Sequence, residues 1–264
     1  MTAERKPVDK TLRALNWLVE TSAKDVGVRQ LATAMNVAPS SAHRILLTLA
    51  KAGFVQQDPV TQRYSLGNEL FRVSQLALIK APLWRAGLPA IQRLVDTCRE
   101  SAVLCVFDEV RREVIYSTAI DAPNSDCNAM ALNKWLPVRT GASGLAILAF
   151  LDEDDLHSVL RQSRYLQCAH DDSAERDRLC TKLAAVRSCG YAIADCQWVA
   201  GAIGLAAPVF GRSGRVMGDI CVTIPRARSG GGNMERLADA ALSCARDISR
   251  RILDGADATA ARLQ

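Results

Sequence analysis

The chain has 264 residues, 49% of them hydrophobic, and a formal net charge of +5 at pH 7. This length is enough for one large or two ordinary domains with hydrophobic cores. The sequence contains no run of about 18 apolar residues to span a membrane, and its start, MTAERKPVDK, has no apolar signal segment. These features exclude a helical membrane protein, and we expect a globular protein of the cytoplasm.

The cysteines indicate the compartment of the protein, and the charges indicate the kind of partner it binds. Nine cysteines are scattered without a CxxC pair, which is typical of buried thiols in a reducing compartment rather than of a disulfide framework. Residues 1–78 hold 10 Lys and Arg against 6 Asp and Glu, whereas the remaining residues hold 23 against 22. Most of the basic excess therefore lies in residues 1–78. An excess of Lys and Arg in this part of the chain suits contact with the phosphate groups of a nucleic acid.

The first elements in chain order are two helices and a turn. Residues 9–22 carry a helical stripe of Leu and Val, and a second, shorter helix begins near Val28. Leu31, Ala32 and Met35 give this second helix one apolar face. Asn36 is expected to end it, because Asn tolerates the left-handed backbone that a sharp turn between helices needs.

A third helix follows directly and completes a helix-turn-helix. Pro39 fits its first turn, and Gly53 fits a left-handed cap at its end. Four apolar residues recur at helical spacing and are expected to face inward: Ala42, Ile45, Leu46 and Leu49. The outward residues are then Ser40, Ser41, His43, Arg44 and Thr48. Hydroxyl groups and an Arg at the front of such a helix suit the major groove of DNA, although a helical hairpin with a solvated face would carry the same pattern.

The residues after this helix predict a two-stranded wing. Residues 54–57 and 63–67 read as strands around the turn 58–62. A wing directly after a recognition helix makes a winged helix, which favours DNA binding. The residues expected to contact DNA are Arg29, Ser40, Ser41, His43, Arg44 and Thr48, with Gln62 and Arg63 of the wing on the backbone or minor groove.

Residues 68–80 predict a linker helix with more apolar residues than a solvated linker needs. Phe71, Val73 and Leu76 are among them. We expect this helix to hold a dimer together, since proteins that read the major groove usually meet two half-sites as two-fold dimers. Packing within one subunit is the alternative. Ala81 and Pro82 mark the boundary, because the residue before a proline disfavours helix.

The rest of the chain predicts an α+β domain. Helices are expected at 83–100, 143–151, 152–160, 173–188 and 234–253, and extended segments at 103–107, 114–119, 136–139, 191–196, 203–210 and 216–224. Strands in antiparallel pairs with helices at the ends give a sheet covered by helices. The predicted domains are a winged helix-turn-helix over 1–67, a linker helix over 68–81 and a second domain over 82–264.

One loop of this second domain is a candidate binding site. Residues 139–144 join an extended segment to a helix, so that free backbone N–H groups at the helix start favour an anion. Gly141 lets a ligand approach the backbone, and Ser143 is a candidate cap. Cys221 and Thr223 lie two apart on the last strand and share one face. A satisfied helix cap and ordinary core residues are the alternative reading.

With these motifs in place, the chain resembles the isocitrate-lyase-regulator (IclR) family of bacterial transcription regulators. The resemblance runs nearly end to end, through APSSAHRILLTLAKAGFV, YSLG, LPVRTGASGLAILAF, CGYAIADCQ, IGLAAPVF and GDICVTIP. It implies a homodimer or homotetramer that binds double-stranded operator DNA, with a GAF/PAS-like carboxy-terminal domain that binds a small metabolite, commonly an organic acid. Two departures are Val28, where members often have a hydroxyl cap, and residues 143–145, which replace the more usual Gly-Lys version.

The resemblance also implies lining positions for an effector pocket. Cys221 and Thr223 correspond to small polar pocket positions of the family, Asp195 falls close to an acidic one, and Gly204 aligns with another. Apolar walls are expected from further residues. The full candidate set is Leu132, Trp135, Leu136, Thr140, Gly141, Ala142, Ser143, Asp195, Ile203, Gly204, Cys221 and Thr223, and the expected ligand is a carboxylate.

Two other classes of protein compete with this interpretation. An enzyme is one, but Cys168 and His170 lack metal-ligand spacing, the chain has three histidines, and the acidic run 152–155 suits a helix start better than a Ca²⁺ site. A ligand-binding module that does not bind DNA is the other. We expect no catalytic residues, no metal and no cofactor.

Overall fold

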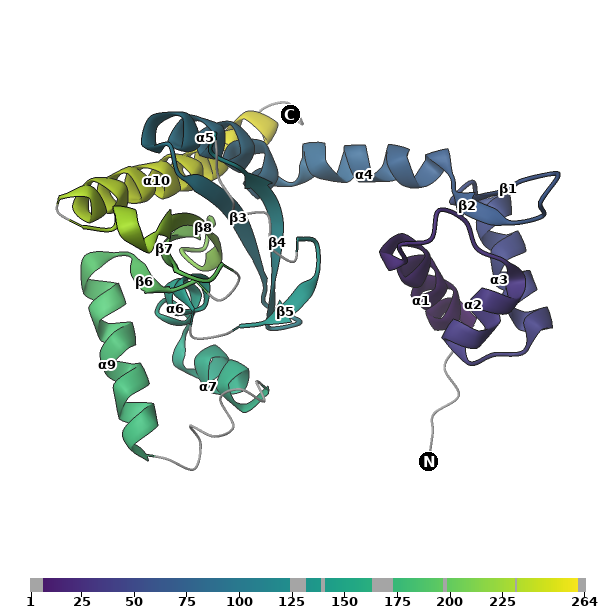
Figure 1. Cartoon of the computed structure of the whole chain (residues 1–264), viewed down its shortest axis with the longest axis horizontal. Helices are drawn as coiled ribbons and strands as arrows, with labels where there is room; N and C mark the ends of the chain where they lie inside the picture. Colours follow the sequence, from purple (N-terminus) through teal and green to yellow (C-terminus); the bar gives the residue numbers. More distant parts are fainter. Residues whose placement is uncertain are drawn as a thin grey trace. The chain divides into compact units, whose positions relative to one another are not determined.

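The computed structural model describes residues 7–123, 132–138, 141–162, 173–196, 199–230 and 232–260. The chain divides into two compact units, Met1–Ala81 and Pro82–Gln264. Figure 1 labels their helices and strands. No helix among the described residues is both long and apolar enough to cross a membrane.

Three helices form the core of the first unit. They are α1 (Pro7–Glu20), α2 (Val28–Met35) and α3 (Pro39–Lys51). The predicted inward residues are confirmed, because Leu31, Ala32 and Met35 of α2 are buried, as are Ala42, Ile45, Leu46 and Leu49 of α3. Asn36 adopts the predicted left-handed backbone, with φ 49° and ψ 56°, and Gly53 has φ 78°. The turn and the end of the recognition helix are thus set by the residues expected to set them.

The wing follows α3 and is tied to the start of α2. It consists of β1 (Val55–Gln57) and β2 (Tyr64–Leu66), which pair antiparallel. Tyr64 is fully buried and its backbone exchanges two hydrogen bonds of 2.8 Å with Val26. The predicted winged helix is therefore confirmed, and the wing extends a bridge to the segment before α2.

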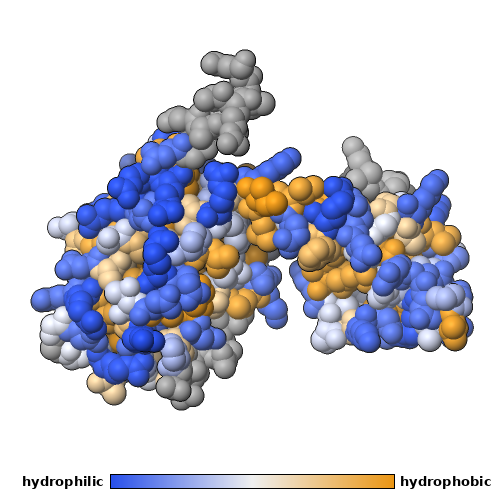
Figure 2. All heavy atoms as spheres, turned by 90° about the horizontal axis from the view of Figure 1, so that it is seen from above, coloured by the Kyte–Doolittle hydropathy of each residue, from blue (hydrophilic) through white to orange (hydrophobic). Residues whose placement is uncertain are grey.

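Helix α4 (Asn68–Lys80) has the predicted bounds and buries none of its residues. Phe71 and Ile79 are 68% and 63% exposed, and Val73, Leu76 and Leu78 are exposed as well. Figure 2 shows apolar, orange atoms at the surface along this segment. Within its own unit this apolar surface is uncovered.

The second unit is built on one antiparallel sheet of six strands. Its strands are β3 (Ser101–Asp108), β4 (Glu113–Ile120), β5 (Trp135–Pro137), β6 (Ala192–Asp195), β7 (Ala202–Phe210) and β8 (Val216–Pro225), in the order β5-β4-β3-β8-β7-β6. The helices are α5 (Pro82–Cys98), α6 (Ala142–Leu148), α7 (Glu153–Gln162), α9 (Ser173–Cys189) and α10 (Asn233–Ala260), with a 3-10 turn at Arg226–Arg228. This confirms the α+β class.

Each face of the sheet has its own core. On one face, α5 and α10 pack on residues that include Leu104, Val222 and Ile224. On the other, α6 and α9 pack on Val103, Cys105 and their neighbours. Because side chains alternate between faces along a strand, the pairing register decides which residues can meet α6.

Candidate nucleic-acid interface and effector site

The outward face of α3 is polar and exposed where the sequence predicts it. Pro39 lies at its start, and its first turns present Ser40, His43 and Arg44 to solvent. Thr48 is exposed, but its hydroxyl donates to the Arg44 carbonyl at 2.9 Å. Arg29 is exposed in the first turn of α2. Leu47, which the sequence analysis did not consider, is 48% exposed on the same side of α3.

A groove of about 550 Å³ runs between α1 and α3 beside this face. It is lined by Lys10, Thr11, Leu12, Ser41, Arg44, Ile45 and Thr48. Three of these are predicted DNA-contact residues, and Lys10 adds a second cation beside Arg44. Sequence reasoning missed Lys10, since only the packing of α1 on α3 brings it to this edge.

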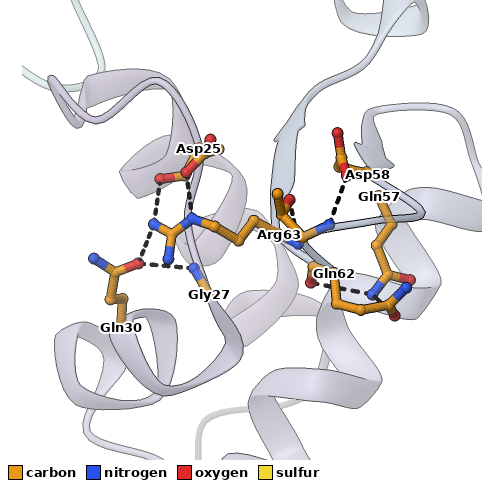
Figure 3. Close-up of polar contacts among 8 residues, drawn as sticks. Asp25, Gly27, Gln30, Gln57, Asp58, Gln62 and Arg63 are labelled. Atoms are coloured by element: carbon orange, nitrogen blue, oxygen red, sulfur yellow. Dashed lines mark hydrogen bonds and ion pairs between the residues drawn. The ribbon is translucent and has the colours of Figure 1, made fainter.

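The side chain of Arg63 has its hydrogen-bond partners within the winged-helix unit (Figure 3). Its Nε donates to Asp25 Oδ1, and its Nη2 donates to the Asp25 carbonyl at 3.0 Å and to Gln30 Oε1 at 2.9 Å. The same Gln30 oxygen accepts from the Gly27 N–H at 2.8 Å. Arg63 thereby fastens the wing to the start of α2, and its expected contact with DNA stays a prediction.

Gln62 is exposed but also has partners within the wing. Its Nε2 donates to the Pro59 carbonyl at 2.9 Å, and Gln57 Nε2 donates to its Oε1 at 2.9 Å. Asp58 accepts from the N–H groups of Val60 and Thr61, which holds its pKa below the ordinary value. The wing turn is therefore ordered by its own side chains.

The second candidate site lies where α6 covers the sheet. Thr223 pairs with Gly204 and Cys221 pairs with Ala206, so that these positions share one face. A Cβ built on Gly204 would lie 3.1 Å from Ala142 Cβ and 3.5 Å from Cys221 Sγ. Small residues here let the start of α6 approach β7 and β8 closely.

The pairing register brings some predicted effector residues to this face. Besides Gly204, Cys221 and Thr223, they are Leu136, which pairs with Val114 in the α6-side core, and Gly141, Ala142 and Ser143 at the start of α6. Thr140 lies outside the described residues.

Three predicted residues lie on the opposite face. Ile203 pairs with Ile224, which belongs to the core under α5 and α10, and Asp195 pairs with Ile203. Asp195 is exposed and forms an ion pair with Arg226. Trp135 is paired with Ile115, and its ring lies 5.1 Å from the guanidinium of Arg111.

The remaining predicted wall residue, Leu132, is 37% exposed in a turn next to β5. Because a shift of one residue moves a side chain to the other face, Ala194 rather than Asp195 lies on the α6 side, in contact with that core. The described residues thus gather only part of the predicted pocket.

Ser143 does not cap α6, contrary to expectation. Gly141 is the N-cap and makes no side-chain cap. Ser143 is the second residue of the helix and is buried, and its hydroxyl donates to Asp219 Oδ1 at 2.9 Å. The hydroxyl groups of Ser143 and Tyr116 also hydrogen-bond to each other.

Asp219 of β8 is a buried carboxyl group that the sequence analysis missed. It lies two residues before Cys221 and therefore on the same face, opposite Cys105 of β3. It is completely buried, and burial raises its pKa from 3.8 to about 7, against a lowering by hydrogen bonds from Ser143 and Cys105. Side chains two residues apart share one face of a strand, so the positions of Thr223 and Cys221 in the sequence could have identified Asp219 as a residue of the same face.

Burial also affects the pKa of the groups around Asp219. Desolvation first, and the charge of Asp219 second, raise the pKa of the Cys105 and Cys221 thiols. Tyr116 has a raised pKa for the same main cause. The two thiols and the tyrosine hydroxyl are therefore neutral at physiological pH. None of these groups can carry a positive charge that would stabilise an ionised Asp219.

Two sequence features were weighed above as signs of an enzyme or a metal site. Cys168 and His170 lie outside the described residues. The acidic run lies at the start of α7, with its last three residues in the first turn of the helix. Asp152 Oδ1 accepts from the Asp155 N–H at 2.9 Å, and Arg215 pairs with the carboxylates of Asp152 and Asp155. In the described part of the chain, no three His, Cys, Asp or Glu residues are grouped as for a metal.

A winged helix-turn-helix followed by a separate α+β unit is the architecture of a DNA-binding regulator with a sensory domain. Comparison with protein families agrees with that class. Residues 7–59 match the IclR helix-turn-helix domain, and residues 75–250 match the family described as bacterial transcriptional regulator IclR, C-terminal. The chain belongs to the IclR family of transcriptional regulators, with a helix-turn-helix DNA-binding domain and a carboxy-terminal effector-binding domain.

Individual relatives resemble the chain over most of its length. The probable HTH-type transcriptional regulator ArcR of Halobacterium salinarum is 28% identical over 206 residues, 78% of each chain. The HTH-type transcriptional regulator BhcR of Paracoccus denitrificans is 24% identical, over 92% of this chain and 86% of that protein. A crystal structure of an IclR homologue from Microbacterium hydrocarbonoxydans, complexed with 4-hydroxybenzoate, has the same fold, with a TM-score of 0.76 at 20% identity over 94% of this chain and 100% of that one.

Proposed function

We propose that the chain reads operator DNA through the outward face of α3. The observation that carries this proposal is the exposure of Ser40, His43 and Arg44 on the first turns of a helix whose opposite face is fully packed. Hydroxyl groups and an Arg at this place can donate to base edges and phosphates. Ser41, Thr48 and Arg29 complete the contact surface, with Lys10 directed to the phosphate backbone beside Arg44.

The wing has a supporting role in this proposal. Because Arg63 donates to Asp25 and Gln30, it acts as a positioning residue that fixes the wing next to α2. Gln62 at the wing turn remains a candidate for contact with the DNA backbone.

The regulator acts as a homodimer held together by α4, or as a homotetramer of two such dimers. Helix α4 exposes five large apolar side chains, which include Phe71 and Ile79; they are unfavourable in water and suit a second copy of the same helix. A two-fold pair of winged helices would match a palindromic operator.

The second unit responds to a small organic acid bound on the α6 face of the sheet. Gly141, Gly204, Cys221 and Thr223 support this, since together they offer close approach to the backbone and small polar groups on one face. The binding of 4-hydroxybenzoate by a homologue with this fold is consistent with such a ligand. The protein has no catalytic role in this proposal, and it acts in the cytoplasm, where bacterial chromosomes lie.

The test of DNA recognition is an affinity measurement on duplexes selected from a random pool with the wild-type protein. Arg44→Ala is expected to weaken binding by about 1 to 3 kcal/mol and to relax the preference at one base position. Arg178→Ala removes the same charge from the exposed surface of α9 and is the control. Unchanged affinity of Arg44→Ala would remove the recognition role of this residue.

A further inference from the structure

Asp219 is an unusual residue for the interior of this sheet. It is completely buried, and its Oδ1 accepts from Ser143 at 2.9 Å, but its Oδ2 has no hydrogen-bond partner among the described residues. A buried polar atom without a partner costs free energy, and such an atom in a folded protein usually has a specific reason.

Among the residues that the structure describes, no cation faces Asp219. The polar groups that face it are the Cys105 thiol of β3, the Tyr116 hydroxyl of β4, the Ser143 hydroxyl of α6 and the Cys221 thiol of β8. From β7, its pairing partner is Pro208, which has no side-chain donor. An apolar residue would fill this position more stably, so the carboxyl group is costly to keep.

Asp219 lies next to the residues proposed to bind the effector. It lies two residues before Cys221 on the same face of β8, about 7 Å away along the strand. Ser143, whose hydroxyl donates to the other oxygen of Asp219, directly follows Ala142, the residue that lies against Gly204. A ligand that binds beside Cys221 and extends along β8 therefore has Asp219 at one end.

We propose that Asp219 is a specificity-determining residue of the effector site, and that the effector carries a hydroxyl group that binds Asp219 Oδ2. This inference rests on the proposed effector site. A hydroxyl group suits this atom because it donates to an ionised carboxylate and accepts from a protonated carboxylic acid. Burial brings the pKa of Asp219 to about 7, so both forms are present near neutral pH. A methyl group in the same place could do neither.

The experiment compares matched ligand pairs on the full-length protein. The probes are 2-, 3- and 4-hydroxybenzoate against the corresponding methylbenzoates, and 2- and 3-hydroxybutanoate against 2- and 3-methylbutanoate, with dissociation constants measured by calorimetry. In at least one pair, the hydroxylated acid is expected to bind about 10-fold or more tightly, as for a hydrogen bond to a charged group.

The variants separate specificity from stability. Asp219→Leu, close in shape and without a hydrogen-bonding atom, is expected to lose the hydroxyl preference while still binding the methylated acid. Asp219→Asn keeps polar atoms in place and is expected to retain part of the preference. Asp195→Leu, an exposed aspartate on the other face, is the control and should behave as wild type.

The outcomes are distinguishable. Acids that bind wild type equally well with and without the hydroxyl overturn the role of Asp219 but leave the effector site standing, as does a preference that persists in Asp219→Leu. Failure of every acid to bind the wild-type protein overturns the proposed effector site and this inference with it. The wild-type pairs alone decide the matter if Asp219→Leu does not fold.

Discussion

Replacing Asp219 by Asn should change how the stability of the second unit depends on pH. Burial raises the pKa of this carboxyl group from the ordinary 3.8 to about 7. Between these values, the folded protein keeps a proton that the unfolded chain has released. The stability associated with Asp219 is therefore fully present below pH 3.8 and is lost as the pH rises toward 7.

The size of this effect follows from the pKa values. The rise amounts to about three pH units, and each unit corresponds to about 1.4 kcal/mol, so the full loss is on the order of 4 kcal/mol. Between pH 5 and pH 7, where the protein is convenient to measure, wild type should lose about 2 kcal/mol relative to Asp219→Asn. The difference between the two proteins should then stay constant above pH 8.

The assay is urea unfolding followed by tryptophan fluorescence in a Trp17→Phe background. Trp17 is the one tryptophan of residues 1–81, so the remaining signal reports on residues 82–264. Asp195→Asn, an exposed aspartate with an ion-pair partner at the surface, is the control and should run parallel to wild type. Parallel pH profiles for wild type and Asp219→Asn would refute the raised pKa that burial gives Asp219.

Three further predictions concern the first unit. Arg63→Gln and Asp25→Asn should each weaken DNA binding by up to about 1 kcal/mol, and the double variant should show no further loss. The salt dependence of binding in DNA titrations should be unchanged, because the proposed role of this pair is to position the wing without contacting phosphate. Gly67→Ala should destabilise the winged helix by about 1 to 3 kcal/mol in thermal unfolding, because the added Cβ would lie 2.2 Å from the Gly53 carbonyl oxygen. Leu76→Glu should yield monomers in sedimentation velocity, because it places a charge on the uncovered face of α4.

Controls for these variants are available in the same chain. Gly230→Ala meets no atom within 4 Å and should leave thermal stability nearly unchanged. Ser74→Glu changes a polar residue of α4 and should remain a dimer if apolar contacts hold the interface. A salt slope that falls by about one in Arg63→Gln would show that Arg63 contacts phosphate directly, and a stable Leu76→Glu dimer would move the interface elsewhere.

The elements of this chain were largely predictable from local patterns. The winged helix and α4 have the predicted order, and α4 has the predicted bounds, because helical periodicity, Asn36, Pro39 and Gly53 each act within a few residues. Helix α10 runs to Ala260, beyond the predicted end at residue 253, and it continues through Gly255.

The candidate sites were less predictable, because they depend on pairing between distant strands. The alternation of side chains along a strand correctly placed Cys221 and Thr223 on one face of the sheet. It could not show that Asp195 and Ile203 lie on the opposite face, because that depends on the pairing between strands. Partners across the fold also decided the roles of Arg63 and Ser143, whose bonds reach Asp25 and Asp219. No local pattern specifies such contacts, which join residues 38 and 76 positions apart.

The most direct test of DNA recognition by this regulator is the salt dependence of its binding to a selected duplex and to a scrambled duplex of equal length. We expect the logarithm of the association constant to fall linearly with the logarithm of salt concentration for both duplexes, because phosphate contacts release counterions. The selected duplex should bind at least about 1000-fold more tightly at physiological salt. Binding that does not depend on salt, or that does not distinguish the two duplexes, would contradict operator recognition through α3.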